Sequence, residues 1–174
     1  MSTTPESDVK PDFLPDDIAG LRRILSEYRR VAIVGLSASW YRPSFFAAKY
    51  LKDHGYQVVP VNPRYDQVLD EPCYASLLDI PDRDSKPIDI VDCFRRAEDI
   101  PPLVDEAISI GAKVLWLQLG VINIEAAQKA HDAGMQVVMD RCMKIEYARQ
   151  FGGLGFIGVN TRIISAKRSK IVAY

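Results

Sequence analysis

The sequence has few cysteines, and their spacing excludes the kinds of site that depend on them. The 174-residue chain contains only Cys73, Cys93 and Cys142, and no two of them form a C-x-x-C pair. A disulfide framework or a structural zinc site needs paired or closely spaced cysteines. We therefore expect neither disulfides nor a metal, and the pattern fits a reducing cytoplasm better than secretion.

Long apolar runs and an excess of one charge are also missing. No apolar run approaches the roughly 20 residues that a membrane-spanning helix needs. The first residues, MSTTPESDVKPDFLP, lack the apolar core of a signal peptide. With 22 Lys and Arg against 23 Asp and Glu, the net charge is −1, so no global field attracts nucleic acid or an anionic membrane. We expect a soluble, cytoplasmic protein that binds neither.

The residues that are present suit one globular domain. Hydrophobic residues make up 48% of the chain and charged residues 26%, an ordinary composition for such a domain. Residues 1–15 are polar and proline-rich, which predicts a flexible N-terminal tail. We expect the domain to span residues 16–150. Residues 151–174 are glycine-rich and then alternating and basic, and we expect a C-terminal extension that packs on the domain or extends from it.

Strand and helix patterns alternate along the predicted domain. Apolar residues at helical spacing predict a first helix over Asp16–Arg30. Strands are predicted over Val31–Gly35, Tyr56–Val61, Ile88–Phe94, Ala112–Gly120 and Met135–Asp140, with helices over Pro43–His54, Pro101–Ile110, Ile124–Ala133 and Met143–Gln150. Five strands joined by crossovers predict an α/β fold with a doubly wound parallel sheet. We expect the strand order 3-2-1-4-5, with a ligand crevice between the first and fourth strands, where the order reverses.

The loop after the first predicted strand, GLSASWYRPS, has features of a phosphate-binding loop. Gly35 permits a tight turn, Ser37 and Ser39 can donate hydroxyls, and Arg42 can contact a phosphate with two donors. The backbone N–H groups near Ser44 begin a helix whose dipole favours anions. Gly35 is, however, the only glycine of the G-x-G-x-x-G dinucleotide fingerprint. A plain turn with an N-capping serine is the alternative.

The second strand ends in Val61-Asn62-Pro63-Arg64, where an NAD-binding protein normally places an acid for the ribose hydroxyl. No acid stands there, and Arg64 is available instead. This pattern favours a ligand whose adenosine ribose carries an extra phosphate, either NADP or coenzyme A. Alternatively, the turn only ends the strand and Arg64 is solvated.

The remaining strand ends carry further candidates. Phe94 could pack on an adenine beside Arg95, although Phe94 could equally be core and the arginine solvent-facing. Gly120 would let the backbone approach a ligand. Cys142 follows the fifth strand just before a predicted helix, where the dipole lowers a thiol pKa, so it is either a reactive thiol or a buried structural cysteine.

Taken together, the segments GLSASWYRPS, GYQVVPVNP, IDIVDCFRR, WLQLGV and VVMDRCMKIEY resemble those of the stand-alone CoA-binding proteins. These are small Rossmann-like domains related to the N-terminal domain of the succinyl-CoA synthetase alpha subunit. The resemblance covers roughly residues 22–147. It departs at Leu36, where relatives often have alanine, and this leaves the path of the loop open.

The resemblance implies a coenzyme A or acyl-CoA ligand lying across the strand ends. The pyrophosphate would be held near Ser44 by the loop with Gly35, Ser37, Ala38 and Ser39, and phosphate would be met by Arg42 and Arg64. The adenosine would be bordered by Val61, Asn62 and Pro63, opposite Phe94 and Arg95. The pantetheine would be approached by Leu119, Gly120, Asp140 and Cys142.

The resemblance implies binding and no reaction. The sequence offers no nucleophile–base pair and no P-loop, so the leading interpretation is a non-catalytic CoA-binding module acting as sensor, carrier or partner. Thiol exchange between Cys142 and the CoA sulfhydryl would extend it. The rivals are an NADP-dependent oxidoreductase using the same loop, and a structural partner that binds no nucleotide. A homodimer or another protein partner is compatible with all three.

Overall fold

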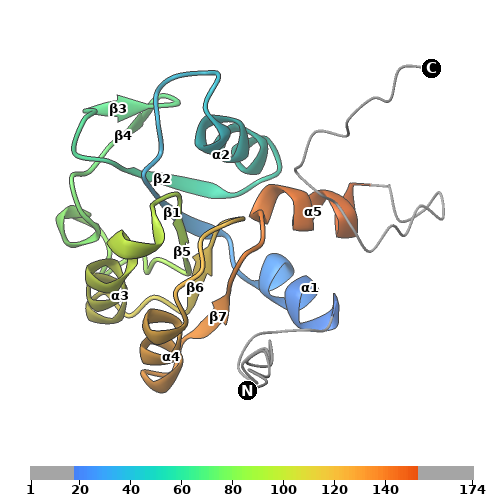
Figure 1. The fold of residues 1–174 in the computed structure, drawn as a ribbon. Helices are drawn as coiled ribbons and strands as arrows, with labels where there is room; N and C mark the ends of the chain where they lie inside the picture. The colour runs from blue at the N-terminus through green and yellow to red at the C-terminus, as the bar shows by residue number, and fades with distance from the viewer. Residues whose placement is uncertain (1–17, 153–174) are drawn as a thin grey trace, which may run out of the picture.

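A five-stranded parallel sheet forms the centre of the computed structural model, which describes residues 18–152 (Figure 1). Its strands are β1 (Arg30–Val34), β2 (Gln57–Val61), β5 (Ile90–Cys93), β6 (Val114–Leu117) and β7 (Gln136–Val138). All neighbouring strands in this sheet run parallel. The predicted α/β class and the five predicted strands are confirmed.

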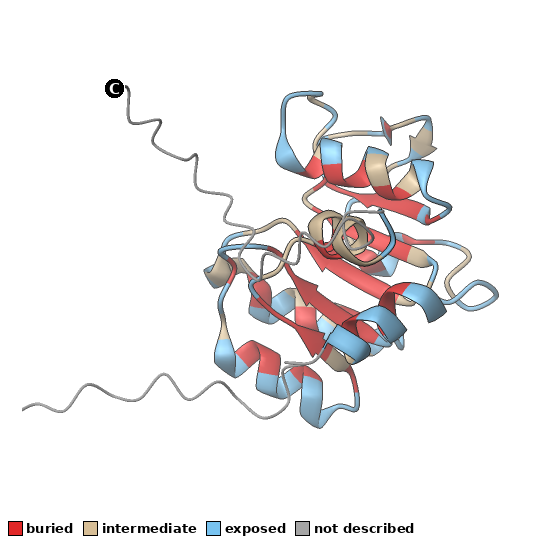
Figure 2. Cartoon of the chain, turned by 90° about the vertical axis from the view of Figure 1, so that its right-hand side faces the viewer, coloured by how far each residue is buried: buried red, intermediate tan, exposed pale blue. Residues whose placement is uncertain are grey.

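Helices cover both faces of the sheet. One face carries α1 (Ile18–Glu27), α2 (Pro43–Asp53) and α5 (Met143–Phe151), and the other carries α3 (Ile100–Ser109) and α4 (Ile124–Asp132) (Figure 1). The strands are buried almost throughout (Figure 2), as their continuous apolar runs predict for a parallel sheet covered on both sides. Two apolar cores result, one under each helical layer.

The strand order differs from the prediction. The observed order is β2-β1-β5-β6-β7, so the third long strand, β5, lies beside β1 and not beside β2. The segment after β2 itself fills the outer edge of β2. The Tyr74 N–H donates to the Pro60 carbonyl at 3.0 Å, and the Asn62 N–H donates to the Tyr74 carbonyl at 2.8 Å. Because that edge is occupied, the chain crosses over β1 and adds β5 on its far side, which moves the reversal to between β1 and β5.

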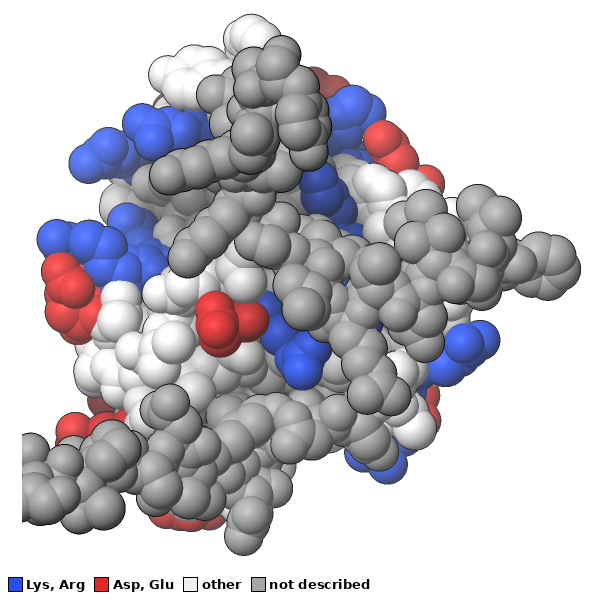
Figure 3. Space-filling model, turned by 45° about the vertical axis from the view of Figure 1, so that its right-hand side comes forward, with Lys and Arg blue, Asp and Glu red and all other residues white. Residues whose placement is uncertain are grey.

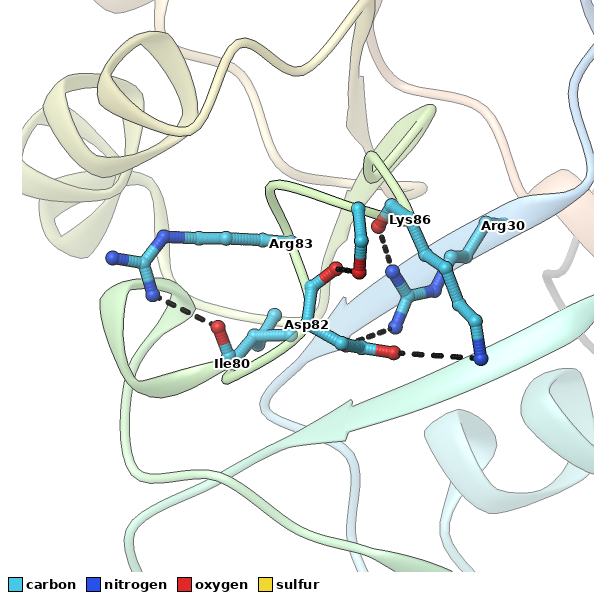
Figure 4. A network of polar contacts seen from close by, with 6 residues as sticks. Arg30, Ile80, Asp82, Arg83 and Lys86 are labelled. Carbon is cyan, nitrogen blue, oxygen red and sulfur yellow. Dashed lines mark hydrogen bonds and ion pairs between the residues drawn. The ribbon is translucent and has the colours of Figure 1, made fainter.

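A polar network holds this crossover against the start of β1 (Figure 4). Arg30 pairs with Asp82 at 2.6 Å and also donates to the Lys86 carbonyl. The Asp89 carboxylate accepts the backbone N–H groups of Arg29 and Arg30 at 3.1 and 3.0 Å. These contacts fix the entry of β5 next to β1, at the end of the sheet opposite the candidate site.

Smaller elements lie in the connections between the long strands. The connection from β2 to β5 contains an antiparallel pair, β3 (Gln67–Val68) and β4 (Glu71–Pro72), and a short 3-10 helix, η1 (Leu77–Asp79). Strands of two residues are too short to show a period in the sequence. A second 3-10 helix, η2 (Ala97–Asp99), precedes α3.

The predicted tail over residues 1–15 and most of the predicted extension over 151–174 lie outside the described residues. No helix in the described range has the length and apolar character needed to cross a membrane.

Candidate functional site

The loops after β1 and β5 meet at Gly35. This residue has φ +86°, and a Cβ added to it would stand 2.3 Å from the carbonyl oxygen of Phe94 and 3.3 Å from Nε of Arg95. The Gly35 N–H donates to the Val61 carbonyl at 2.8 Å. The carboxyl ends of β2, β1 and β5 are therefore in direct contact, and only glycine fits at their centre.

Three serines build the turn that follows Gly35. The Ser37 N–H donates to Ser44 Oγ, and the Ser39 N–H donates to Ser37 Oγ, both at 3.1 Å. The alternative of an N-capping serine is not observed, because the N-cap of α2 is Arg42, which makes no side-chain cap, and the buried Ser44 lies inside the helix. Ala38 is exposed at the tip of the turn.

Asn62 joins the loop after β2 to the loop after β1. Its side chain is buried, donates from Nδ2 to the Leu36 carbonyl at 3.0 Å, and accepts the Arg64 N–H at 3.1 Å. Leu36 itself is fully buried in the core under α1, α2 and α5. The bulkier residue at this position therefore anchors the loop. Val61 is buried beside them, and Pro63 is exposed.

Three arginines follow three neighbouring strands without an ion pair to any carboxylate of residues 18–152. They are Arg42, Arg64 and the half-buried Arg95. Arg42 lies over the Tyr41 ring, 5.7 Å from its centroid. Arg96, by contrast, pairs with acids of η2, including Glu98 at 2.9 Å. Figure 3 shows Lys and Arg side chains alongside Asp and Glu side chains on one face of the molecule.

Asp140 ties the loop after β7 to the loop after β6, since its carboxylate accepts the Gly120 N–H at 2.7 Å. Leu119, the neighbour of Gly120, is 44% exposed. Half-buried Cys142 follows as the N-cap of α5. Burial raises the pKa of its thiol, with the Asp92 charge adding to the rise. Of the two alternatives for Cys142, this direction favours the buried structural cysteine over the reactive thiol.

Sequence reasoning missed a buried polar pair beneath these loops. Asp92 in β5 is fully buried, and its two carboxylate oxygens accept from Gln118 Nε2 at 2.8 and 3.0 Å. Burial raises the pKa of Asp92 from 3.8 to about 7, although the Gln118 hydrogen bond opposes the rise. The available signal was a carboxylate inside the apolar run IDIVDCF.

Within the described part of the chain, no group of three or more His, Cys, Asp or Glu side chains is arranged to hold a metal ion. The hydrogen-bond donors described at the strand ends include backbone N–H groups, hydroxyls and guanidinium groups. Such donors suit phosphate oxygens.

The chain is similar in sequence to several known proteins. The family model described as a CoA binding domain matches residues 29–148. The chain is 39% identical over 130 residues to the uncharacterized protein YneT of Bacillus subtilis, covering 75% of this chain and 93% of that protein. It is 33% identical over 87 residues to the acetate–CoA ligase [ADP-forming] II of Archaeoglobus fulgidus, covering 49% of this chain and only 12% of the ligase.

Solved structures show the same fold. A hypothetical protein from Pyrococcus horikoshii superposes with a TM-score of 0.74 at 40% identity, covering 83% of this chain and 98% of that one. A Thermus thermophilus structure gives 0.73 at 34% identity, covering 78% and 99%. The Rossmann-like α/β fold is thus shared along nearly the whole of these relatives, and with the match over residues 29–148 it places this chain in the CoA binding domain family.

Proposed function

We propose that the chain binds coenzyme A or an acyl-CoA across the carboxyl ends of β1, β2 and β5. The observation that carries this proposal is the presence of Arg42, Arg64 and Arg95 after these three strands, without carboxylate partners among residues 18–152. Coenzyme A carries a pyrophosphate and a ribose 3′-phosphate, and guanidinium groups are suited to bind both.

Each loop has a proposed role. The turn with Gly35, Ser37, Ala38 and Ser39 takes the pyrophosphate, assisted by the start of α2 near Arg42 and Ser44. Arg64 takes a phosphate, and the adenosine lies between Val61-Asn62-Pro63 and Phe94-Arg95. The pantetheine runs toward Leu119, Gly120, Asp140 and Cys142. The contacts around Gly35 and Asn62 support the first two assignments, because they join the three loops into one surface.

We infer a binding module without a reaction of its own. The matching family is described as a CoA binding domain, which supports binding. The ligase relative shares only 12% of its length with this chain, so we do not infer ligase activity. A sensor, a carrier or a subunit of a larger assembly would each use such a module.

Calorimetric titration with CoA, acetyl-CoA, dephospho-CoA, NADP and NAD in one buffer tests the proposal. We expect saturable binding of CoA or acetyl-CoA, weaker binding of dephospho-CoA because the 3′-phosphate is missing, and no heat with NAD. Binding of NADP alone would overturn the proposal in favour of an oxidoreductase. Binding of no ligand at all would favour a structural partner.

A further inference from the structure

The hydroxyl of Tyr65 lies against the turn that follows β1. Its Oη is 3.4 Å from Ser37 Oγ, and it also interacts with the backbone of Ala38 and the side chain of Ser39. The pKa of the phenol lies below its usual value, mainly because of the Ser37 hydrogen bond, with the contacts to Ala38 and Ser39 and the Arg64 charge acting in the same direction. The phenol oxygen thus lies at the turn, within hydrogen-bonding distance of Ser37 Oγ.

The fold places Tyr65 there through the loop after β2. The Tyr65 N–H donates to the Asn62 carbonyl at 3.4 Å, and the Asn62 side chain is bound to the Leu36 carbonyl at 3.0 Å. The half-buried Tyr65 ring packs on the core that contains Leu36. The Tyr65 ring and the turn after β1 are therefore both fixed to the same core.

Two backbone N–H groups of the turn already donate to serine hydroxyls. The Ser37 N–H is bound to Ser44 Oγ, and the Ser39 N–H is bound to Ser37 Oγ, both at 3.1 Å. The groups left for an anion are the two serine hydroxyls and the Ala38 backbone N–H. Tyr65 Oη lies beside one of these groups, Ser37 Oγ, and its pKa is also influenced by Ala38 and Ser39.

We propose that Tyr65 Oη occupies the place of one pyrophosphate oxygen in the turn Ser37–Ser39, so that coenzyme A must displace it to bind. This inference rests on the function proposed above and adds an affinity-determining residue to that site. A charged phosphate oxygen accepts stronger hydrogen bonds than a neutral phenol, so the exchange favours the ligand. Contacts that must first be broken nonetheless weaken the measured affinity.

The variant Tyr65→Phe tests the inference because it keeps the ring on the core and removes only the hydroxyl. We expect the Kd for CoA to fall about 3- to 10-fold, the size of one net hydrogen bond. Tyr74→Phe is the matched control. Tyr74 is also half-buried in the β2–β5 connection, but it packs on the opposite core, and its substitution should leave the Kd within about twofold, since such a change is below one net hydrogen bond.

A pH titration followed by phenolate absorbance provides a second readout on the free protein. Wild type should contain a phenol whose pKa lies below the usual value, and Tyr65→Phe should lack it. A wild type without this phenol, together with a Kd for CoA that does not change in Tyr65→Phe, would overturn the inference.

The failures are distinguishable. If wild type binds CoA and Tyr65→Phe binds equally or more weakly, the hydroxyl does not compete with the ligand, and the inference falls while the proposed function stands. If wild type, Tyr65→Phe and Tyr74→Phe all fail to bind CoA, both fall. Binding by Tyr65→Phe alone would support the inference in its strongest form.

Discussion

The Asp140 carboxylate accepts the backbone N–H of Gly120 at 2.7 Å, and both residues have positive φ angles of +57° and +83°. The contact joins the loops after β6 and β7 at the same end of the sheet as the turn after β1. It also explains why a non-glycine residue holds a left-handed conformation here, because Asp and Asn tolerate that region when a local hydrogen bond compensates.

Replacing Asp140 should show how much the hydrogen bond and the tolerance of the left-handed conformation contribute together. Asp140→Ala loses the hydrogen bond and places a less tolerant residue at positive φ, so we expect the free energy of unfolding to fall by about 1–2 kcal/mol. Asp140→Asn keeps an acceptor and the tolerance, and should cost less than about 0.5 kcal/mol. Urea denaturation measures the loss in both variants, and a loss as small for Asp140→Ala as for Asp140→Asn would show that the contact contributes nothing.

Gly35 and Gly55 form a matched pair, since both have φ +86° but only Gly35 has backbone within reach of a new Cβ. Gly55→Ala should cost about 1 kcal/mol of stability, from the left-handed conformation alone. Gly35→Ala should cost about 2 kcal/mol more, because its Cβ would stand 2.3 Å from the Phe94 carbonyl oxygen. Thermal or urea unfolding tests this difference, and equal costs would mean that the loops after β1 and β5 separate easily.

The sequence predicted the alternation of elements and failed on the order of the strands. The period of the apolar residues locates β1 and β5, but their pairing depends on side-chain contacts that the period does not encode. Arg30 reaches Asp82 across 52 positions in the sequence, and Tyr74 fills the edge of β2. The same limit applies to the site. The sequence alone identified Gly35, whereas the contact between Tyr65 and Ser37 could only be found once the fold had placed their loops together.

Asp92 should make stability depend on pH. Its folded pKa of about 7 exceeds the ordinary 3.8, so the folded state holds a proton that the unfolded state has lost between these values. The stabilisation of the folded state by this proton is therefore fully present below about pH 4 and is lost as the pH rises to 7. Asp92→Asn removes this dependence and should gain about 2–4 kcal/mol relative to wild type between pH 4 and pH 8. Urea unfolding at both pH values checks it, and parallel pH profiles would contradict it.

Arg95 and Arg96 are neighbours with different surroundings. Arg95 lies beside Gly35 without a carboxylate partner in the described range, whereas Arg96 pairs with Glu98 and Asp99. Arg95→Ala should therefore weaken CoA binding about 10- to 100-fold, the effect of one charged hydrogen bond, and Arg96→Ala should change it less than about threefold. Calorimetry measures both, and added salt should weaken wild type more than Arg95→Ala. Equal effects of the two variants would remove Arg95 from the site.

Cys142 should behave as a thiol of low reactivity, although it stands at the start of a helix. A helix dipole stabilises the thiolate form of a cysteine, whereas burial in apolar surroundings destabilises the same charged form. Here burial raises the pKa, and the nearby Asp92 carboxylate opposes the thiolate as well. Iodoacetamide at pH 7 should alkylate Cys142 more slowly than a cysteine in an unfolded peptide, and Asp92→Asn should increase the rate at pH 8, where Asp92 would otherwise be ionised. Mass spectrometry of digested samples separates Cys142 from Cys73 and Cys93. Rapid alkylation of Cys142 at pH 7 would show that the dipole outweighs burial, and would reopen thiol exchange with CoA as a reaction of this site.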